Sequence, residues 1–94
     1  MTEKLHGDTE FLFRTILSIK DEKECEAFFA GLCPCNELEA MAQRLTAAKL
    51  LMAGETYEKI ISETDISSAT LSRVSRCVKY GEGYSSVLKK LSGQ

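Results

Sequence analysis

Basic and hydroxyl-bearing residues gather between Thr56 and Lys79 in an arrangement that could bind an anion. Two short amphipathic segments are joined there by a tight turn, and the second segment, from Ser67 to Tyr80, has three basic residues and no acid. Cations and small polar side chains on one helix are typical of a helix that enters a DNA major groove. The spacing therefore predicts a helix-turn-helix over about residues 56–80, with double-stranded DNA as its ligand.

The second helix of this motif carries side chains of two kinds. Short ones near its start, at Ser68, Ala69 and Ser72, can touch base edges, and the two arginines can reach bases or phosphates. Because the base-reading side chains are short, we expect water bridges and DNA shape to contribute to specificity. A lysine of the preceding helix and the positive helix N-terminus would add phosphate contacts. The predicted DNA-binding residues are Lys59, Ser67, Ser68, Ala69, Thr70, Ser72, Arg73, Arg76 and Lys79.

A helix-turn-helix keeps its shape only if apolar side chains pack in the corner between the two helices. Ile60 on the first helix should face Leu71 and Val74 on the second, and Ile66 in the turn should fill the corner. Asp65 stands where the turn usually has glycine. Aspartate tolerates left-handed backbone dihedrals better than most residues, so the turn can still form.

The same segment has a simpler interpretation, because helical hairpins are common in all-helical cores. On that interpretation the protein is a dimerisation or adaptor module that binds no nucleic acid. Replacing Arg73 and Arg76 by alanine separates the two functions. A lost DNA complex with an unchanged dimer would favour DNA binding, whereas an unfolded dimer would make the arginines structural.

Charge is divided unevenly along this chain of 94 residues, whose net charge is −2. That value argues against an indiscriminate nucleic-acid binder, but charge acts locally. The segment 67–80 has a local charge of +3, whereas the segment 3–26 holds seven acids against four bases. We expect one face of the protein to meet phosphate and another to face water.

The single proline and the lack of strand-like alternation predict an all-α domain of about six helices over residues 1–94. Residues 1–7 are expected to be a disordered lead. Asp8 should cap the first helix, and Asp21 should cap the second, which should end at Gly31. The other helices are expected at about 36–53, ending at Gly54, and then at 56–64, 67–80 and 84–91.

Large apolar side chains are more numerous in the first half of the chain than one small domain can hide. They are dense between Phe11 and Ile19 and recur at Phe28 and Phe29. A chain this short buries only a modest core, so we expect a homodimer with a shared core. The long helix adds an apolar stripe with helical spacing. Its residues are Leu38, Met41, Leu45, Ala48 and Met52.

Several classes of protein are not expected. No apolar run approaches the ~20 residues needed to cross a bilayer, and the polar N-terminus lacks a signal-peptide core. We therefore expect a cytoplasmic protein with no membrane partner. An enzyme is not expected either, because His6 has no evident nucleophile partner and there is no glycine-rich phosphate loop. Glu55, Glu58 and Glu63 are spaced like a solvated helix face rather than an acid–base pair.

The segment Cys33-Pro34-Cys35 invites a metal or redox interpretation. Its spacing differs from the C-x-x-C of zinc and thioredoxin-like sites, and no histidine lies near it. Cys25 and Cys77 fit the role of small apolar packing residues. We expect structural thiols, no metal and no cofactor, and DNA binding that responded to thiol oxidation would contradict this.

Three stretches of the chain resemble the Trp repressor family, most closely its YerC/YecD branch. They are the joint at 32–34, EAMAQRLTAAKLLMAGETYEKI at 39–60, and SATLSRVSRCVKYGEGY at 68–84. The resemblance implies a transcriptional repressor with an intertwined all-α homodimer, in which the first helices and the terminal helix wrap the partner. Two helix-turn-helix units would then bind a palindromic operator one helical turn apart.

The resemblance also implies a place for an effector between the long helix and the recognition helix. In tryptophan-binding members two arginines and a threonine line this place, and a glycine makes room for the indole. In this chain Val74 occupies the position of that glycine. Cys77 occupies the position of a serine that contacts the ligand's amino group. We therefore expect no tryptophan binding, and any effector is unknown. The residues at the implied effector pocket are Arg44, Thr70, Arg73, Val74 and Cys77.

Overall fold

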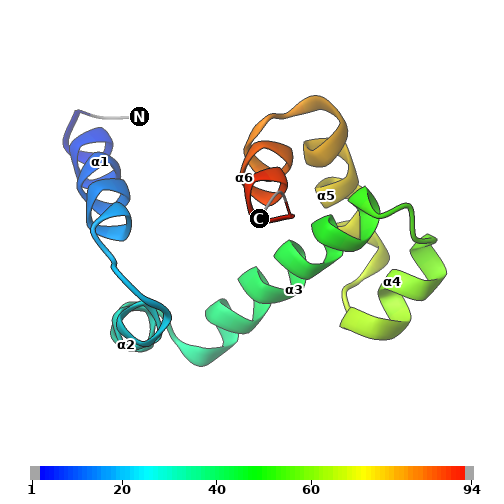
Figure 1. Ribbon diagram of the computed structural model, residues 1–94, viewed down its shortest axis with the longest axis horizontal. Helices are drawn as coiled ribbons and strands as arrows, with labels where there is room; N and C mark the ends of the chain where they lie inside the picture. The colour runs from blue at the N-terminus through cyan, green and yellow to red at the C-terminus, as the bar shows by residue number, and fades with distance from the viewer. Residues whose placement is uncertain (1–2, 93–94) are drawn as a thin grey trace. The chain divides into compact units, whose positions relative to one another are not determined.

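The computed structural model describes residues 3–92, and this part of the chain folds into six α-helices (Figure 1). The predicted all-α class and helix count are confirmed. No helix of the described part is long and apolar enough to cross a membrane. The chain divides into two compact units between Cys35 and Asn36. The helices are α1 (Glu3–Leu17), α2 (Glu22–Leu32), α3 (Cys35–Met52), α4 (Tyr57–Thr64), α5 (Ser68–Tyr80) and α6 (Gly83–Ser92).

Helix α1 begins earlier than predicted. Residues 3–7 lie inside the helix, so the expectation of a disordered lead was wrong for them, and residues 1 and 2 lie outside the described part. Asp8 is an interior residue of α1 rather than its N-cap. One turn apart on this helix, His6 Nε2 lies 3.0 Å from Glu10 Oε1. Such i, i+4 contacts stabilise a helix from within, and this one supports the turn that we had left out.

Helix α2 begins as predicted and ends later. Asp21 caps it, and its carboxylate accepts a hydrogen bond from the backbone N–H of Glu24 at 2.8 Å. Gly31, the predicted end, remains helical, and Cys33 is the first residue with extended dihedrals. The reason is Pro34, because proline disfavours helical dihedrals at the residue before it. A proline therefore ends this helix where we had expected a glycine to do so.

The described side chains of the first unit form no buried core of their own. No side chain among residues 6–35 is buried. Phe11 is 66% exposed and Leu17 is 83% exposed. Phe28 and Phe29 pack edge to face, with ring centroids 5.3 Å apart, but both rings remain partly open to solvent. The apolar side chains that predicted a shared core are thus uncovered within a single chain.

All of α3 after Cys35 lies in the second unit; the helix ends at Met52, and Gly54 terminates it as predicted. Gly54 has a φ of +86°, and its N–H donates to the Leu51 carbonyl at 3.0 Å. The N–H of Glu55 donates to the Leu50 carbonyl at 3.1 Å. This pair of bonds is a Schellman motif, which satisfies the last carbonyls of the helix and turns the chain toward α4.

The core of the second unit forms where the C-terminal half of α3 meets α4 and α5. Ala47 and Ala48 of α3 are fully buried, because their small side chains let the other helices approach closely. Leu45 and Met52, which we placed on the apolar stripe of α3, are exposed instead. Of the predicted stripe, Ala48 lies in this core and packs there beside Ala47, whereas the larger side chains Leu45 and Met52 lie outside it. The buried apolar cluster is Ala47, Ala48, Ile60, Ile66, Leu71 and Val74.

Candidate nucleic-acid interface

Helices α4 and α5 form the predicted helix-turn-helix, with residues 65–67 as the turn. Asp65 adopts left-handed dihedrals, φ +60° and ψ +18°, and is the one non-glycine residue of the described chain with a positive φ. Its N–H donates to the Ile61 carbonyl at 2.9 Å and closes the last turn of α4. The expectation that aspartate could replace glycine at this turn is confirmed.

The apolar corner of the motif is packed as predicted. Ile60 of α4 and Leu71 of α5 have no exposed surface. Ile66 in the turn and Val74 of α5 belong to the same buried cluster. Because these side chains come from both helices and from the turn between them, the corner holds α5 against α4.

Hydroxyl groups cap both helices of the motif. Thr56 caps α4 and accepts the backbone N–H of Lys59 at 3.2 Å. Ser67 caps α5, where its Oγ accepts the backbone N–H of Thr70 at 3.1 Å and donates to Thr70 Oγ1 at 2.9 Å. Two of the predicted DNA-binding hydroxyls are thus also engaged with each other at the start of α5. Their pairing holds the first turn of that helix in place.

Apart from Lys59, the remaining residues predicted to contact DNA are all exposed, and all lie on α5. Their helix has no acid in its first turn, and Lys79 lies in its last turn. A positive helix N-terminus, two arginines and a lysine therefore act together with no opposing carboxylate on the same helix. The exposed residues are Ser68, Ala69, Ser72, Arg73, Arg76 and Lys79.

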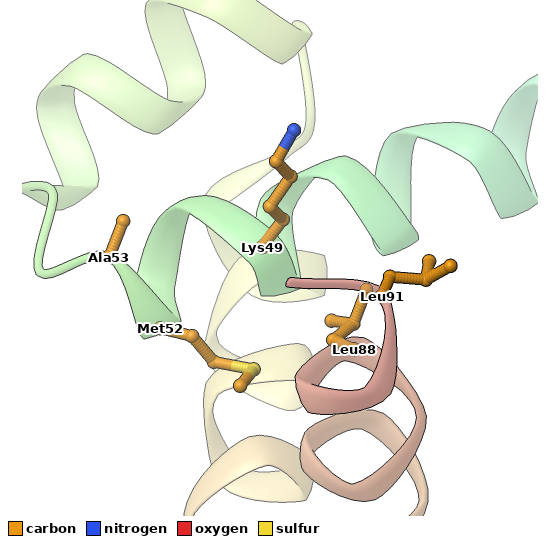
Figure 2. A pocket seen from close by; sticks show the side chains of 5 residues that line it. All are labelled: Lys49, Met52, Ala53, Leu88 and Leu91. Carbon is orange, nitrogen blue, oxygen red and sulfur yellow. The ribbon is translucent and has the colours of Figure 1, made fainter. Parts of the chain in front are cut away.

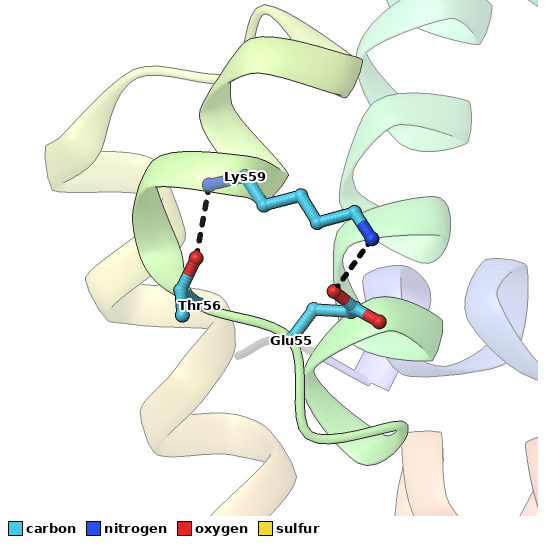
Figure 3. A network of polar contacts seen from close by, with 3 residues as sticks. All are labelled: Glu55, Thr56 and Lys59. Atoms are coloured by element: carbon cyan, nitrogen blue, oxygen red, sulfur yellow. Dashed lines mark hydrogen bonds and ion pairs between the residues drawn. The ribbon is translucent and has the colours of Figure 1, made fainter.

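Lys59 has an acidic partner that sequence reasoning overlooked. Its Nζ lies 3.0 Å from Oε2 of Glu55, the residue just before the α4 cap. Figure 3 shows this ion pair beside the Thr56 cap. The hydrogen bond to Glu55, the charge of Glu55 and the charge of Glu63 all raise the pKa of the Lys59 ammonium. This ion pair could have been predicted from the sequence, because Glu55 precedes Lys59 by four residues, a spacing at which oppositely charged side chains often pair. The local positive charge on α4 is therefore partly neutralised.

The residues of the implied effector pocket have different surroundings. Val74 is buried in the corner, Arg44 and Thr70 are half-buried, and Arg73 and Cys77 are exposed. None of them lines either of two hollows on the described surface. The larger hollow has a volume of about 460 Å³, and the smaller one of about 240 Å³. Their lining residues are Lys49, Met52, Ala53, Leu88 and Leu91 for the larger, and Ala42, Gln43, Thr46, Glu63 and Thr64 for the smaller.

The cysteines are dispersed over the described chain. Cys25 and Cys33 are half-buried, Cys35 and Cys77 are exposed, and none of the four is in a disulfide. No group of three or more histidine, cysteine or acidic side chains that could hold a metal occurs among the residues that the structure describes.

Known proteins share this arrangement over most of the chain. The family model described as Trp repressor protein matches residues 8–92. The uncharacterized protein YerC of Bacillus subtilis is 51% identical over 80 residues, which are 84% of this chain and 77% of YerC. A crystal structure of a candidate Trp repressor from Staphylococcus aureus has a TM-score of 0.87 and 37% identity, covering 92% of this chain and 87% of that one. A TrpR-like protein from Eubacterium eligens has a TM-score of 0.87 and 41% identity, with 92% and 90% covered.

Proposed function

Because this chain belongs to the Trp repressor family, a family of DNA-binding regulators, we propose that it is a sequence-specific transcriptional repressor. It would read a palindromic operator as a homodimer, with one helix-turn-helix from each copy in the major groove. The family model spans both compact units, so we also propose that residues 1–94 act as one domain. Such a regulator works where the DNA is, in the cytoplasm, and it is not an enzyme.

The observation that carries this proposal is the exposed, acid-free face of α5. Ser68, Ala69 and Ser72 are short enough to let the helix approach base edges, and they would make the base contacts. Arg73 and Arg76 would contact bases or phosphates. Thr70 and Lys79 would bind phosphates, with a weaker contribution from Lys59 because of its pairing with Glu55.

The proposed homodimer is supported by the uncovered apolar side chains of both units. Leu45 and Met52 lie exposed along α3, and α1 exposes Phe11 and Leu17. The larger hollow lies between the end of α3 and α6, and its walls are mostly apolar (Figure 2). Surfaces of this kind are unusual on a monomer and typical of an interface between subunits. A second copy would cover them, as the family's intertwined architecture implies.

We propose that tryptophan is not an effector of this protein. Val74 is buried in the helix-turn-helix corner, where its side chain packs with Ile60 and Leu71. It stands at the position where tryptophan-binding members have a glycine that makes room for the indole. This chain therefore uses for core packing the space that a corepressor would need. DNA binding without tryptophan is the consequence that we propose.

A salt titration on random-sequence duplex DNA, followed by selection of tight sites from a random pool, tests the proposed function. Binding that weakens steeply with salt shows that phosphates are neutralised. An enriched palindrome with half-sites about one helical turn apart shows that two recognition helices read it together. A folded dimer that binds no duplex at low salt would contradict the proposal and favour the adaptor module.

A further inference from the structure

A buried hydroxyl spans the turn of the helix-turn-helix. Thr64 is the last residue of α4, and its side chain is one of the two buried polar side chains of the described chain. Its Oγ1 donates a hydrogen bond to the Ile60 carbonyl at 2.7 Å and accepts one from the Ile66 backbone N–H at 3.3 Å. One atom thus joins the end of α4 to the middle of the turn.

This bridge constrains the residue that fills the corner. The Ile66 side chain is buried, so its backbone N–H is carried away from solvent and needs a partner. A buried N–H left without a partner costs more free energy than a formed hydrogen bond contributes. Asp65 turns the chain through its left-handed dihedrals, and Thr64 then holds Ile66 one residue before the α5 cap, Ser67. The hydroxyl therefore helps to determine where α5 begins.

We propose that Thr64 is a positioning residue for base readout, an inference that rests on the proposed DNA-binding function. Thr64 itself does not contact DNA. It acts through Ile66 on the placement of α5, whose base-reading side chains are short and tolerate little displacement. The long side chains of Arg76 and Lys79 can follow phosphates after a small shift. Loss of the Thr64 hydroxyl should therefore weaken binding to a specific site more than binding to random DNA.

The test compares Thr64→Val, which keeps the shape and removes the hydroxyl, with Thr64→Ser, which keeps the hydroxyl. Dissociation constants are measured for the selected site and for a random duplex at one salt concentration, well below the melting temperature. We expect Thr64→Val to weaken binding to the selected site by about tenfold, as expected for one unsatisfied buried N–H. Binding to random duplex should stay within about twofold, because phosphate contacts supply it. Thr64→Ser should restore the wild-type ratio of specific to random binding.

Val78→Ala is the matched control, because Val78 packs against the same core from a position away from the turn. It should lower the melting temperature and leave the ratio of specific to random binding unchanged. An unchanged ratio in Thr64→Val, or an equal loss on both duplexes, would overturn the inference. If Thr64→Val does not fold, Thr64→Ala lacks the same hydroxyl and is judged by the same ratio. A wild-type protein that binds neither duplex would overturn the proposed function, and this inference with it.

Discussion

The helix pair α1–α2 and the helix-turn-helix α4–α5 are both pairs of consecutive helices, yet they differ in how their apolar side chains are covered. The helix-turn-helix packs Ile60, Ile66, Leu71 and Val74 into a corner completed by two alanines of α3. Between residues 6 and 35, by contrast, nothing is buried. A small number of residues is enough to build a core when they lie close together around one turn. A pair of helices whose large side chains face outward needs another surface to cover those side chains.

This difference teaches that the helix-turn-helix, which we propose reads DNA, is built mainly from local contacts, whereas the large side chains of α1 and α2 need another surface to cover them. The reader depends on caps, a left-handed residue and a corner of four side chains, all within residues 56–80. The helix pair has a good N-cap and an edge-to-face phenylalanine pair, but these local features leave its largest side chains open. In the proposed homodimer, the stability of this helix pair would depend on the partner subunit and on protein concentration.

The largest expected effect comes from a charge placed on the uncovered face. Leu17 is so exposed in one chain that Leu17→Glu should be harmless to a monomer. In the proposed dimer it would put a carboxylate into an apolar interface, and we expect at least about a hundredfold weaker dimerisation. Analytical ultracentrifugation over a dilution series measures this. Glu22→Gln, on an exposed residue of α2, is the control, and an unaffected Leu17→Glu dimer would mean that α1 faces solvent.

A cavity in the corner should have the next largest effect. Leu71→Ala removes a fully buried side chain and should lower the free energy of unfolding by about 2–5 kcal/mol. Urea denaturation at several protein concentrations measures the loss. If the comparison between the two helix pairs holds, the loss will persist at high protein concentration, since the corner is internal to one chain. A loss that vanished at high concentration would place this leucine in the dimer interface.

Arginine removal should affect DNA binding without affecting folding. Arg73→Ala and Arg76→Ala should each weaken binding by about 1–3 kcal/mol where a base is contacted, or reduce the salt slope by about 1 where a phosphate is contacted. Both side chains are exposed, so the melting temperature of the dimer should stay unchanged. Fluorescence anisotropy with labelled duplex, beside thermal melts, separates the two outcomes. A fall in melting temperature would make the arginines structural.

A smaller effect of opposite sign is expected at Glu55. In the wild-type protein the Glu55 carboxylate pairs with Lys59 and raises the pKa of the Lys59 ammonium. Glu55→Gln removes this carboxylate, so the pKa of Lys59 should fall toward its ordinary value. Lys59 stays protonated at neutral pH, because that ordinary value is far above 7. The released cation should tighten DNA binding by a few fold, on the order of one added phosphate contact, and steepen the salt dependence. Glu55→Gln in a Lys59→Gln background should give no gain.

No effect at all is expected from tryptophan. Because Val74 is buried in the corner, micromolar L-tryptophan should produce no saturable heat in calorimetry and no change in DNA affinity. Val74→Gly is the informative companion, since it opens the space beside the recognition helix and should also destabilise the corner. Saturable binding to the wild-type protein would contradict the expectation.

Most of the helix-turn-helix could be predicted from the sequence because its determinants are local. Thr56 and Ser67 as caps, Asp65 as the left-handed residue and Gly54 as the end of α3 each act within a few residues of their own position. The corner residues follow from the same short spacing. The Glu55–Lys59 pair could also have been found at this level, because its i, i+4 spacing was present in the sequence.

Features that depend on what lies across space could not be predicted. The sequence alone determined the all-α class, the positions of the turns and the side chains that fill the corner. Only the tertiary structure decided that α3 packs through Ala47 and Ala48 while Leu45 stays exposed, because which helix face is covered depends on the size of the facing side chains. It also decided that the Thr64 hydroxyl bridges the turn. A threonine at a helix end has several possible partners, and the folded chain brings only some of them within hydrogen-bond distance.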